Sequence, residues 1–413
     1  MARSGSKDAI GHIHSAATHA AAPPATAGGS VALARTHAAH LILDAGSLRR
    51  KLAGRMRRRL LVVAGTALLC CIQVPTVKGQ GALVLVGSGS TVPAPLVSKW
   101  TEVYNQRATN AKIRYVASGT DEGITAISHG SGDFAMGEVP LTSQQHLKSG
   151  LIPVPAVVIG IVPIYNLPGN PPDLKFSGEV LADIFLGRIK NWNSPVLGKL
   201  NPGVKFPDLA IRVINRPPGK GSNYIFTEYL SKVSARFRSE VGVSASPKWP
   251  VGKPASRSSE MVETVMSEMG AIGFVEAQYA IGSRIPFGLV LNASRNFVKA
   301  SAESLTEACR AVEAPGFDKF SASLTNAHGE HSFPIASFDW FYLRKDVEDP
   351  KRTAALEEFL DWAFSDGQQI AAEAGYADLP VPLRAKISTR LRTMHQKETA
   401  QSRSEISSSY FGN

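Results

Sequence analysis

Cysteine and histidine are scarce in the 413-residue sequence, and both are unevenly placed. Two of the three cysteines, Cys70 and Cys71, lie in an apolar run near the N-terminus, which leaves only Cys309 in the rest of the chain. One cysteine cannot form an internal disulfide, so a disulfide-stabilised scaffold is excluded there. No Cys/His set has the spacing of zinc ligands, and five of the ten histidines lie within the first 40 residues. We therefore expect no metal site and no cofactor.

Excess positive charge is missing from most of the chain, although the formal net charge is +11. Residues 1–79 contain 11 Lys and Arg against 2 acidic residues, so residues 80–413 contain 34 basic and 32 acidic residues. This balance excludes the basic surface that nucleic-acid binding requires, and we expect no such partner. The chain is 44% hydrophobic, which is typical of a globular protein, and its length suits one large or two medium domains.

A long hydrophobic run is also absent. Arg57–Arg59 precede Leu60–Ile72, a stretch of 13 uncharged residues that is shorter than the roughly 20 residues a membrane helix needs. The pattern is typical of a signal peptide with cleavage before Gln80. We assign residues 1–79 to a leader, with the signal peptide at about 56–79, and expect a periplasmic or extracellular protein. One alternative is a signal anchor that stays in the membrane. Another is a location in the secretory route or an organelle of a eukaryote.

Strand–loop–helix units recur along the remaining chain, which predicts an α/β fold. The run 156–165 suits a strand that crosses between two lobes, and Ser177 and Gly187 suit the start and end of a helix. Strands are predicted at 82–86, 113–117, 133–136, 156–165, 210–215, 270–275 and 338–343. Helices are predicted from about Pro93, after the loop Ser118–Gly123, and at 178–186, 223–230 and 353–374.

Three loops rich in Gly, Ser and Thr each lead into a predicted helix: Gly87–Thr91, Ser118–Gly123 and Arg216–Ser222. A helix N-terminus presents unpaired N–H groups and a partial positive charge, so it suits an anion. Arg216 would add a guanidinium fork for an oxyanion. Such loops also open many helices for turn geometry alone. Together the three loops and the arginine favour an anion site.

Several motifs resemble the phosphate-binding protein of the phosphate-specific ABC transporter, from about Ala82 to Pro380. The resemblance implies the type II periplasmic-binding-protein fold: two α/β lobes joined by two crossover hinges, a ligand cleft between them, and no catalysis. The motifs are Gly87–Pro95 (GSGSTVPAP), Leu181–Asn193 (LADIFLGRIKNWN), Leu200–Gly203 (LNPG), Lys248–Pro250 (KWP), Gly270–Glu276 (GAIGFVE) and Phe333–Ile335 (FPI).

The fold that the resemblance implies also divides the chain. Lobe one would comprise 81–158 plus 336–395, lobe two 159–335, and residues 396–413 would form a loose tail. The crossovers would lie near Val157–Val162 and Ile335–Phe338.

The resemblance places phosphate contacts on nine residues. Glu138 takes the position of an aspartate that accepts the ligand's own proton, which sulfate lacks at neutral pH, so Glu138 would reject sulfate. Glu138 is one methylene longer than aspartate, and as a residue taken alone it could be a solvated surface acid. The expected ligand-binding residues are Ser90, Thr91, Val92, Thr120, Glu138, Arg216, Lys220, Gly221 and Ser222.

The sequence departs from the family at these loops. Pro218 replaces an aspartate that braces the arginine, and Lys220 replaces a serine. Asp121 and Glu122 replace two small residues. If either acid faces the cleft, it would repel a dianion; if both face solvent, the site is only more cationic than usual.

The resemblance therefore predicts a secreted, monomeric binding protein that captures inorganic phosphate for transport or sensing, with an ABC permease as its membrane partner. It would not be an enzyme. The alternatives are a receptor for another oxyanion or a phosphorylated compound, a surface protein whose site has lapsed, and a phosphohydrolase. The sequence favours the last one least, because it shows no cluster of metal ligands and no Gly-x-Ser-x-Gly at Gly87–Gly89.

Overall fold

The computed structural model describes residues 82–391 except 109, 142–147, 172, 313–321, 346 and 348. The predicted leader and the predicted loose tail lie outside the described residues and stay predictions. Within the described part of the chain, no helix is both long enough and apolar enough to cross a membrane.

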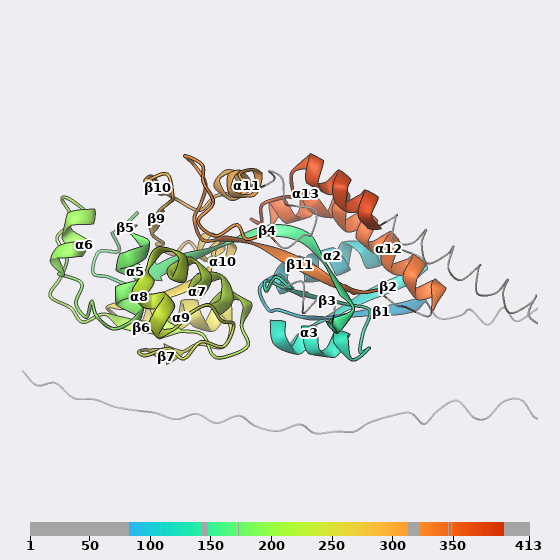
Figure 1. Cartoon of the computed structure of the whole chain (residues 1–413), viewed down its shortest axis with the longest axis horizontal. Helices are drawn as coiled ribbons and strands as arrows, with labels where there is room; N and C mark the ends of the chain where they lie inside the picture. The colour runs from blue at the N-terminus through green and yellow to red at the C-terminus, as the bar shows by residue number, and fades with distance from the viewer. Residues whose placement is uncertain are drawn as a thin grey trace, which may run out of the picture. The chain divides into compact units, whose positions relative to one another are not determined.

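A mixed eight-stranded sheet with the order β2-β1-β3-β11-β4-β8-β6-β7 forms the frame (Figure 1). Strands β1, β2 and β3 are parallel to one another, as are β6, β7 and β8, whereas β11 is antiparallel to β3 and β4, and β4 to β8. The strands are β1 Leu83–Gly89, β2 Ala111–Ala117, β3 Phe134–Gly137, β4 Leu151–Tyr165, β6 Arg212–Asn215, β7 Lys253–Pro254, β8 Ala271–Glu276 and β11 Ala336–Arg344. A second sheet contains β5 Lys175–Phe176, β9 Leu289–Leu291 and β10 Phe297–Val298.

Strand β4 links the two halves of the large sheet. It pairs with β11 from Leu151 to Gly160 and with β8 from Ile161 to Tyr165. All of its residues are buried, which explains why the sequence there is a continuous apolar run. This change of partner falls within the crossover predicted at Val157–Val162, and β11 begins at the second one. The two-lobed α/β fold with two crossovers is thereby confirmed, whereas the exact lobe boundaries stay a prediction.

Helices cover both halves of the sheet (Figure 1). Those that contact the β1–β2–β3 half, directly or through α2, are α2 Ala94–Arg107, α3 Thr120–Ser128, α12 Pro350–Phe364 and α13 Asp366–Glu373. The others are α5 Gly178–Phe185, α6 Pro195–Leu200, α7 Gly221–Val233, α8 Ala235–Glu240, α9 Ser258–Ser267, α10 Ala277–Gly282 and α11 Ala302–Arg310. As predicted, Ser177 caps α5 by accepting a hydrogen bond from the Val180 N–H at 3.2 Å, and Gly187 follows it with a φ of 70°.

Several sequence-based predictions were wrong in detail. The second and third predicted loops are shorter than expected, because α3 already begins at Thr120 and α7 at Gly221. The first loop does not begin at Gly87, because β1 continues to Gly89 by pairing with β2 up to Ala117. The helix predicted at 353–374 is two helices, α12 and α13. The backbone of Ser365 leaves the helical region (φ −109°, ψ −95°), and its hydroxyl donates to the Asp361 carbonyl at 2.8 Å.

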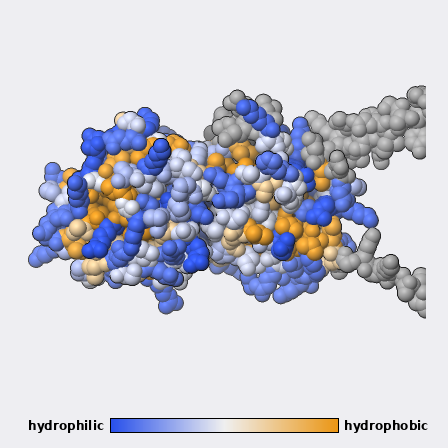
Figure 2. Space-filling model, turned by 90° about the horizontal axis from the view of Figure 1, so that it is seen from below, coloured by the Kyte–Doolittle hydropathy of each residue, from blue (hydrophilic) through white to orange (hydrophobic). Residues whose placement is uncertain are grey.

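Hydrophobic residues on the surface do not form one continuous face. On the side shown in Figure 2 they gather in separate areas, with residues of intermediate hydropathy between them. Large aromatic residues are instead buried in both halves of the sheet. Phe134, Phe341 and Phe359 contact one another in one half, and Phe185, Phe226 and Phe274 do so in the other.

Candidate functional site

Three buried residues of the predicted site follow directly after parallel strands. Ser90 follows β1, Glu138 follows β3 and Arg216 follows β6. The carboxyl ends of parallel strands are the usual place for ligands in α/β sheets. The first residues of two helices, Thr120 of α3 and Gly221 of α7, lie beside them.

Glu138 is fully buried. Its Oε2 accepts a hydrogen bond from Thr120 Oγ1 at 2.7 Å, whereas its Oε1 has no hydrogen-bond partner. Burial raises the pKa of Glu138 to about 7; the hydroxyls of Ser90 and Thr120 act in the opposite direction, and the charge of Glu276 adds to the rise. The alternative that Glu138 is a solvated surface acid is therefore wrong.

Arg216 is also buried, with 1% of its surface exposed. Its Nε donates to Ser222 Oγ at 3.2 Å, its Nη2 donates to Ser258 Oγ at 3.2 Å, and Nη2 lies 3.6 Å from Glu276 Oε1. These three side chains hold the guanidinium, and Pro218 is exposed. The buried Nη1 has no partner, so it is a donor available to an anion.

The two halves of the fold touch at Gly221. A Cβ atom placed on Gly221 would lie 1.6 Å from Glu138 Oε2 and 2.9 Å from Thr120 Oγ1. Only a glycine allows the start of α7 to approach the Glu138 carboxylate this closely. The carboxylate therefore lies at the N-termini of both α3 and α7.

The acids Asp121 and Glu122 are exposed rather than buried in the cleft. A Cβ atom on Gly219 would lie 3.7 Å from Asp121 Oδ2 and 3.8 Å from Glu122 Oε1, so both carboxylates lie beside the third loop. Partial burial, together with the charge of Glu122, raises the pKa of Asp121. The two acids thus combine features of both cases that the sequence left open. They are exposed to solvent, and their carboxylates also lie beside the loops of the proposed site.

The other predicted residues are sequence neighbours of Ser90 or Gly221, but their roles in ligand binding stay predictions. Val92 is buried, and its N–H donates to Ser90 Oγ at 3.0 Å. Thr91 and Lys220 are half-buried, and Lys220 is the residue that precedes α7. Ser222 is fully buried against Arg216.

Three residues of this cluster were not predicted: Ser258, Glu276 and Asp339. Glu276 and Asp339 are fully buried acids on β8 and β11. Burial and the charges of Glu138 and Glu276 raise the pKa of Asp339 well above its usual range. An acid inside an apolar strand is the signal that could have identified both. Ser258 offers no such signal.

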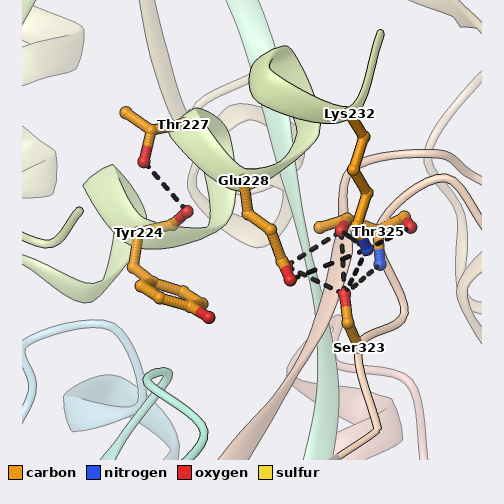
Figure 3. A network of polar contacts seen from close by, with 6 residues as sticks. All are labelled: Tyr224, Thr227, Glu228, Lys232, Ser323 and Thr325. Carbon is orange, nitrogen blue, oxygen red and sulfur yellow. Dashed lines mark hydrogen bonds and ion pairs between the residues drawn. The ribbon is translucent and has the colours of Figure 1, made fainter. Parts of the chain in front are cut away.

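Helix α7, which begins at the site, is tied to a distant segment of the chain (Figure 3). Glu228 Oε2 accepts hydrogen bonds from Ser323 Oγ at 2.9 Å and Thr325 Oγ1 at 2.8 Å. Lys232 Nζ donates to the same two hydroxyls and lies 3.6 Å from Glu228 Oε1. This network fixes the C-terminal half of α7, and with it the position of the helix start at Gly221.

Within the described residues, no group of three or more His, Cys, Asp or Glu side chains is arranged to hold a metal ion. The buried acids are thus arranged around hydroxyls and one guanidinium. Such a set can bind an oxyanion that carries a proton of its own.

The PBP superfamily domain matches residues 75–367 of the chain. The chain is 36% identical to the phosphate-binding protein PstS of Pasteurella multocida over 76% of this chain and 91% of that protein. It is 34% identical to PstS of Xylella fastidiosa, over 76% and 86%. A solved structure of a putative phosphate ABC transporter substrate-binding protein with bound phosphate, from Clostridium perfringens, superimposes with a TM-score of 0.53. At 19% identity, covering 72% of this chain and 100% of that one, it shows the shared fold alone.

Proposed function

Because this chain belongs to the PstS phosphate-binding protein family within the PBP superfamily, we propose that it is a solute-binding protein that captures inorganic phosphate. The observation that carries the proposal is that two buried groups of the predicted site each have a polar atom without a hydrogen-bond partner. Arg216 has a free Nη1 donor, and Glu138 has a free Oε1 acceptor. Hydrogen phosphate is an oxyanion that needs both a hydrogen-bond donor and a hydrogen-bond acceptor.

Phosphate would be held by the guanidinium of Arg216 and by hydroxyls at the starts of the helices. Ser90 and Ser222 are buried and can donate to phosphate oxygens. The hydroxyl of Thr120 donates to Glu138, so Thr120 would contribute its backbone N–H at the start of α3. The N-termini of α3 and α7 would add backbone N–H groups and their partial positive charge. Thr91, Val92, Lys220 and Gly221 complete the proposed contact set.

Glu138 would provide the selectivity. Hydrogen phosphate can donate its O–H to the carboxylate, whereas sulfate would place an oxygen against another oxygen with no proton between them. A buried site built for a donor strongly rejects an analogue that lacks it.

Capture would close the cleft by bending at the crossovers in β4 and at the start of β11. The contact between Gly221 and Glu138 belongs to the closed state, because it joins residues from the two halves of the sheet. Release would require these residues to separate.

We further propose that the protein is secreted, acts without catalysis and delivers phosphate to a membrane ABC permease or a sensor. The predicted leader supports secretion. Membership of a family of solute-binding proteins supports the absence of catalysis. The alternative of a lapsed site is less well supported, because it does not account for the buried partners of Arg216.

Isothermal titration of the purified protein with phosphate at neutral pH, repeated in excess sulfate, tests the proposal. We expect saturable one-to-one binding that sulfate does not displace. A folded protein that gives no heat with phosphate, or that binds sulfate equally well, would contradict it. Turnover of phosphate esters by the same preparation would show an enzyme instead.

A further inference from the structure

The first ligand loop, Ser90–Val92, is fixed by hydrogen bonds at most of its backbone groups. The Ser90 N–H donates to the Met136 carbonyl at 2.9 Å, and the Val92 N–H donates to Ser90 Oγ at 3.0 Å. The carbonyls of Ser90 and Val92 each accept a hydrogen bond from a tyrosine hydroxyl. Among the described residues, the N–H of Thr91 has no hydrogen-bond partner. Backbone N–H groups are normally paired with protein, water or a ligand, so this donor is available to a ligand.

The two tyrosines come from distant parts of the chain. Tyr115 lies on β2 and donates to the Ser90 carbonyl at 2.8 Å. Tyr376 follows α13 and donates to the Val92 carbonyl at 3.0 Å. Burial raises the pKa of both phenols well above the usual range, so both hydroxyls keep their protons near neutral pH and remain donors.

Both tyrosines are anchored to the sheet. The ring of Tyr115 stacks on Phe134 of β3, with ring centroids 6.4 Å apart. Tyr376 is followed by Ala377, which pairs with Val158 of β4 through two backbone hydrogen bonds of 2.9 and 3.1 Å. Rigid elements outside the loop therefore fix its conformation, which is the arrangement that a preorganised binding site requires.

The Tyr115 contact also sets the direction of the free donor. In a planar trans peptide, the carbonyl of one residue and the N–H of the next point in opposite directions. The Ser90 carbonyl points toward Tyr115, which packs against the core, so the Thr91 N–H points away from the core. Thr91 is half-buried and lies just beyond the carboxyl end of β1, at the edge of the sheet where the predicted site lies. Because Tyr376 fixes the carbonyl of Val92, the loop is held on both sides of Thr91.

We propose that Tyr115 and Tyr376 are positioning residues for phosphate, which hold the first ligand loop so that the Thr91 N–H faces the bound anion. This inference rests on the proposed function. Neither tyrosine donates to the anion, because each hydroxyl donates its one proton to a backbone carbonyl. The Thr91 N–H is then in place before phosphate arrives, and a loop that is already ordered loses less conformational entropy on binding.

Tyr115→Phe and Tyr376→Phe test the assignment, because each removes one hydroxyl and keeps the ring. Each change leaves one carbonyl of the loop without its donor, and we expect the dissociation constant for phosphate to rise about tenfold. Titration calorimetry measures it, with urea denaturation as the measure of stability. The two variants are independent tests, so the inference remains testable if one of them does not fold.

Tyr165→Phe is the matched control. The Tyr165 hydroxyl donates to the Pro171 carbonyl at 2.8 Å, so the change removes the same kind of hydrogen bond from a segment that contains no proposed ligand contact. We expect all three variants to lose comparable stability, whereas the control should bind phosphate as tightly as the wild type.

The amide signal of Thr91 separates positioning from a general loss of stability. The protein is prepared with isotopically labelled threonine, and the signal is identified by its loss in Thr91→Ser. In the wild type and in Tyr165→Phe, we expect the amide proton signal to move downfield when phosphate binds, because the N–H then donates to a charged oxygen. In Tyr115→Phe and Tyr376→Phe, we expect a smaller movement at saturating phosphate.

A tyrosine variant that binds phosphate as tightly as Tyr165→Phe would overturn the inference for that tyrosine. A Thr91 signal that does not move in the wild type, or that moves equally in the tyrosine variants, would overturn it for both tyrosines. These outcomes would leave the proposed function intact. Absence of phosphate binding by the folded wild type would overturn the inference and the proposed function together.

Discussion

The Cα of Gly221 lies so close to Glu138 that a Cβ atom there would stand 1.6 Å from Glu138 Oε2. These residues are 83 positions apart and belong to opposite halves of the sheet. Their contact joins the start of α7 to the carboxylate proposed to accept a hydrogen bond from the O–H group of phosphate. Closure of the cleft and recognition of the ligand thus depend on the same few atoms.

Gly221→Ala should hold the cleft open. The added methyl group would overlap Glu138, and relief of such overlap costs about 1–3 kcal/mol, so phosphate affinity should fall by roughly tenfold to a hundredfold. Gly198→Ala is the control, because no atom lies within 4 Å of the Cβ that it adds in helix α6. Titration calorimetry compares the two. Equal affinity for both variants would show that this contact does not govern closure.

Arg216→Ala should abolish useful binding. Loss of hydrogen bonds to a charged group is expected to cost about 3 kcal/mol, roughly a hundredfold in affinity. The substitution also leaves Glu276 buried without its ion-pair partner, which should lower the free energy of unfolding by about 3–5 kcal/mol. Urea denaturation and phosphate titration measure both effects. Arg212→Ala, an exposed arginine on the same strand β6, should change neither.

Glu138→Gln should reduce the discrimination against sulfate. The amide N–H₂ can donate to a sulfate oxygen, so sulfate should become a measurable competitor while phosphate binds more weakly. Competition titrations give the ratio of the two dissociation constants. The control is Glu263→Gln, which removes an exposed carboxylate on α9. If sulfate remained excluded by Glu138→Gln, another residue would have to provide the selectivity.

The ligand-free protein should lose stability as the pH rises from about 4.5 to about 7. The pKa of Glu138 rises from 4.5 to about 7 on folding, so in this interval the folded state retains a proton that the unfolded state releases. The contribution of Glu138 to the free energy of unfolding should therefore fall by roughly 3 kcal/mol over this interval. Urea denaturation without phosphate measures it. Glu138→Gln should remove this part of the decrease, whereas an unchanged profile in that variant would contradict the assignment.

The sequence predicted the main strands, and the resemblance to the phosphate-binding family predicted the ligand contacts at Glu138 and Arg216. In the structure both residues come directly after short apolar strands, and in an α/β sheet such positions converge at one edge. The glycine-rich composition of Gly87–Gly89 predicted a loop, but these residues are paired in β1. The break at Ser365 had no signal, because the apolar helical pattern continues on both sides of it.

The roles of Glu276 and Asp339 could not be predicted from local patterns. Asp339 comes near Glu138 because β11 pairs with β3, about 200 residues away in the sequence, and Glu276 meets Arg216 from a third segment. Such convergence depends on the strand order of the sheet. A rule that marks single acids inside apolar strands would have found both residues, but not their partners.

A crystal structure of the protein with phosphate would test the central proposal most directly. We predict that the anion lies between the two halves of the sheet, with Arg216 Nη1 and a carboxylate oxygen of Glu138 each within hydrogen-bond distance of a phosphate oxygen. An anion bound elsewhere, or one in this cleft that contacts neither group, would contradict the proposal.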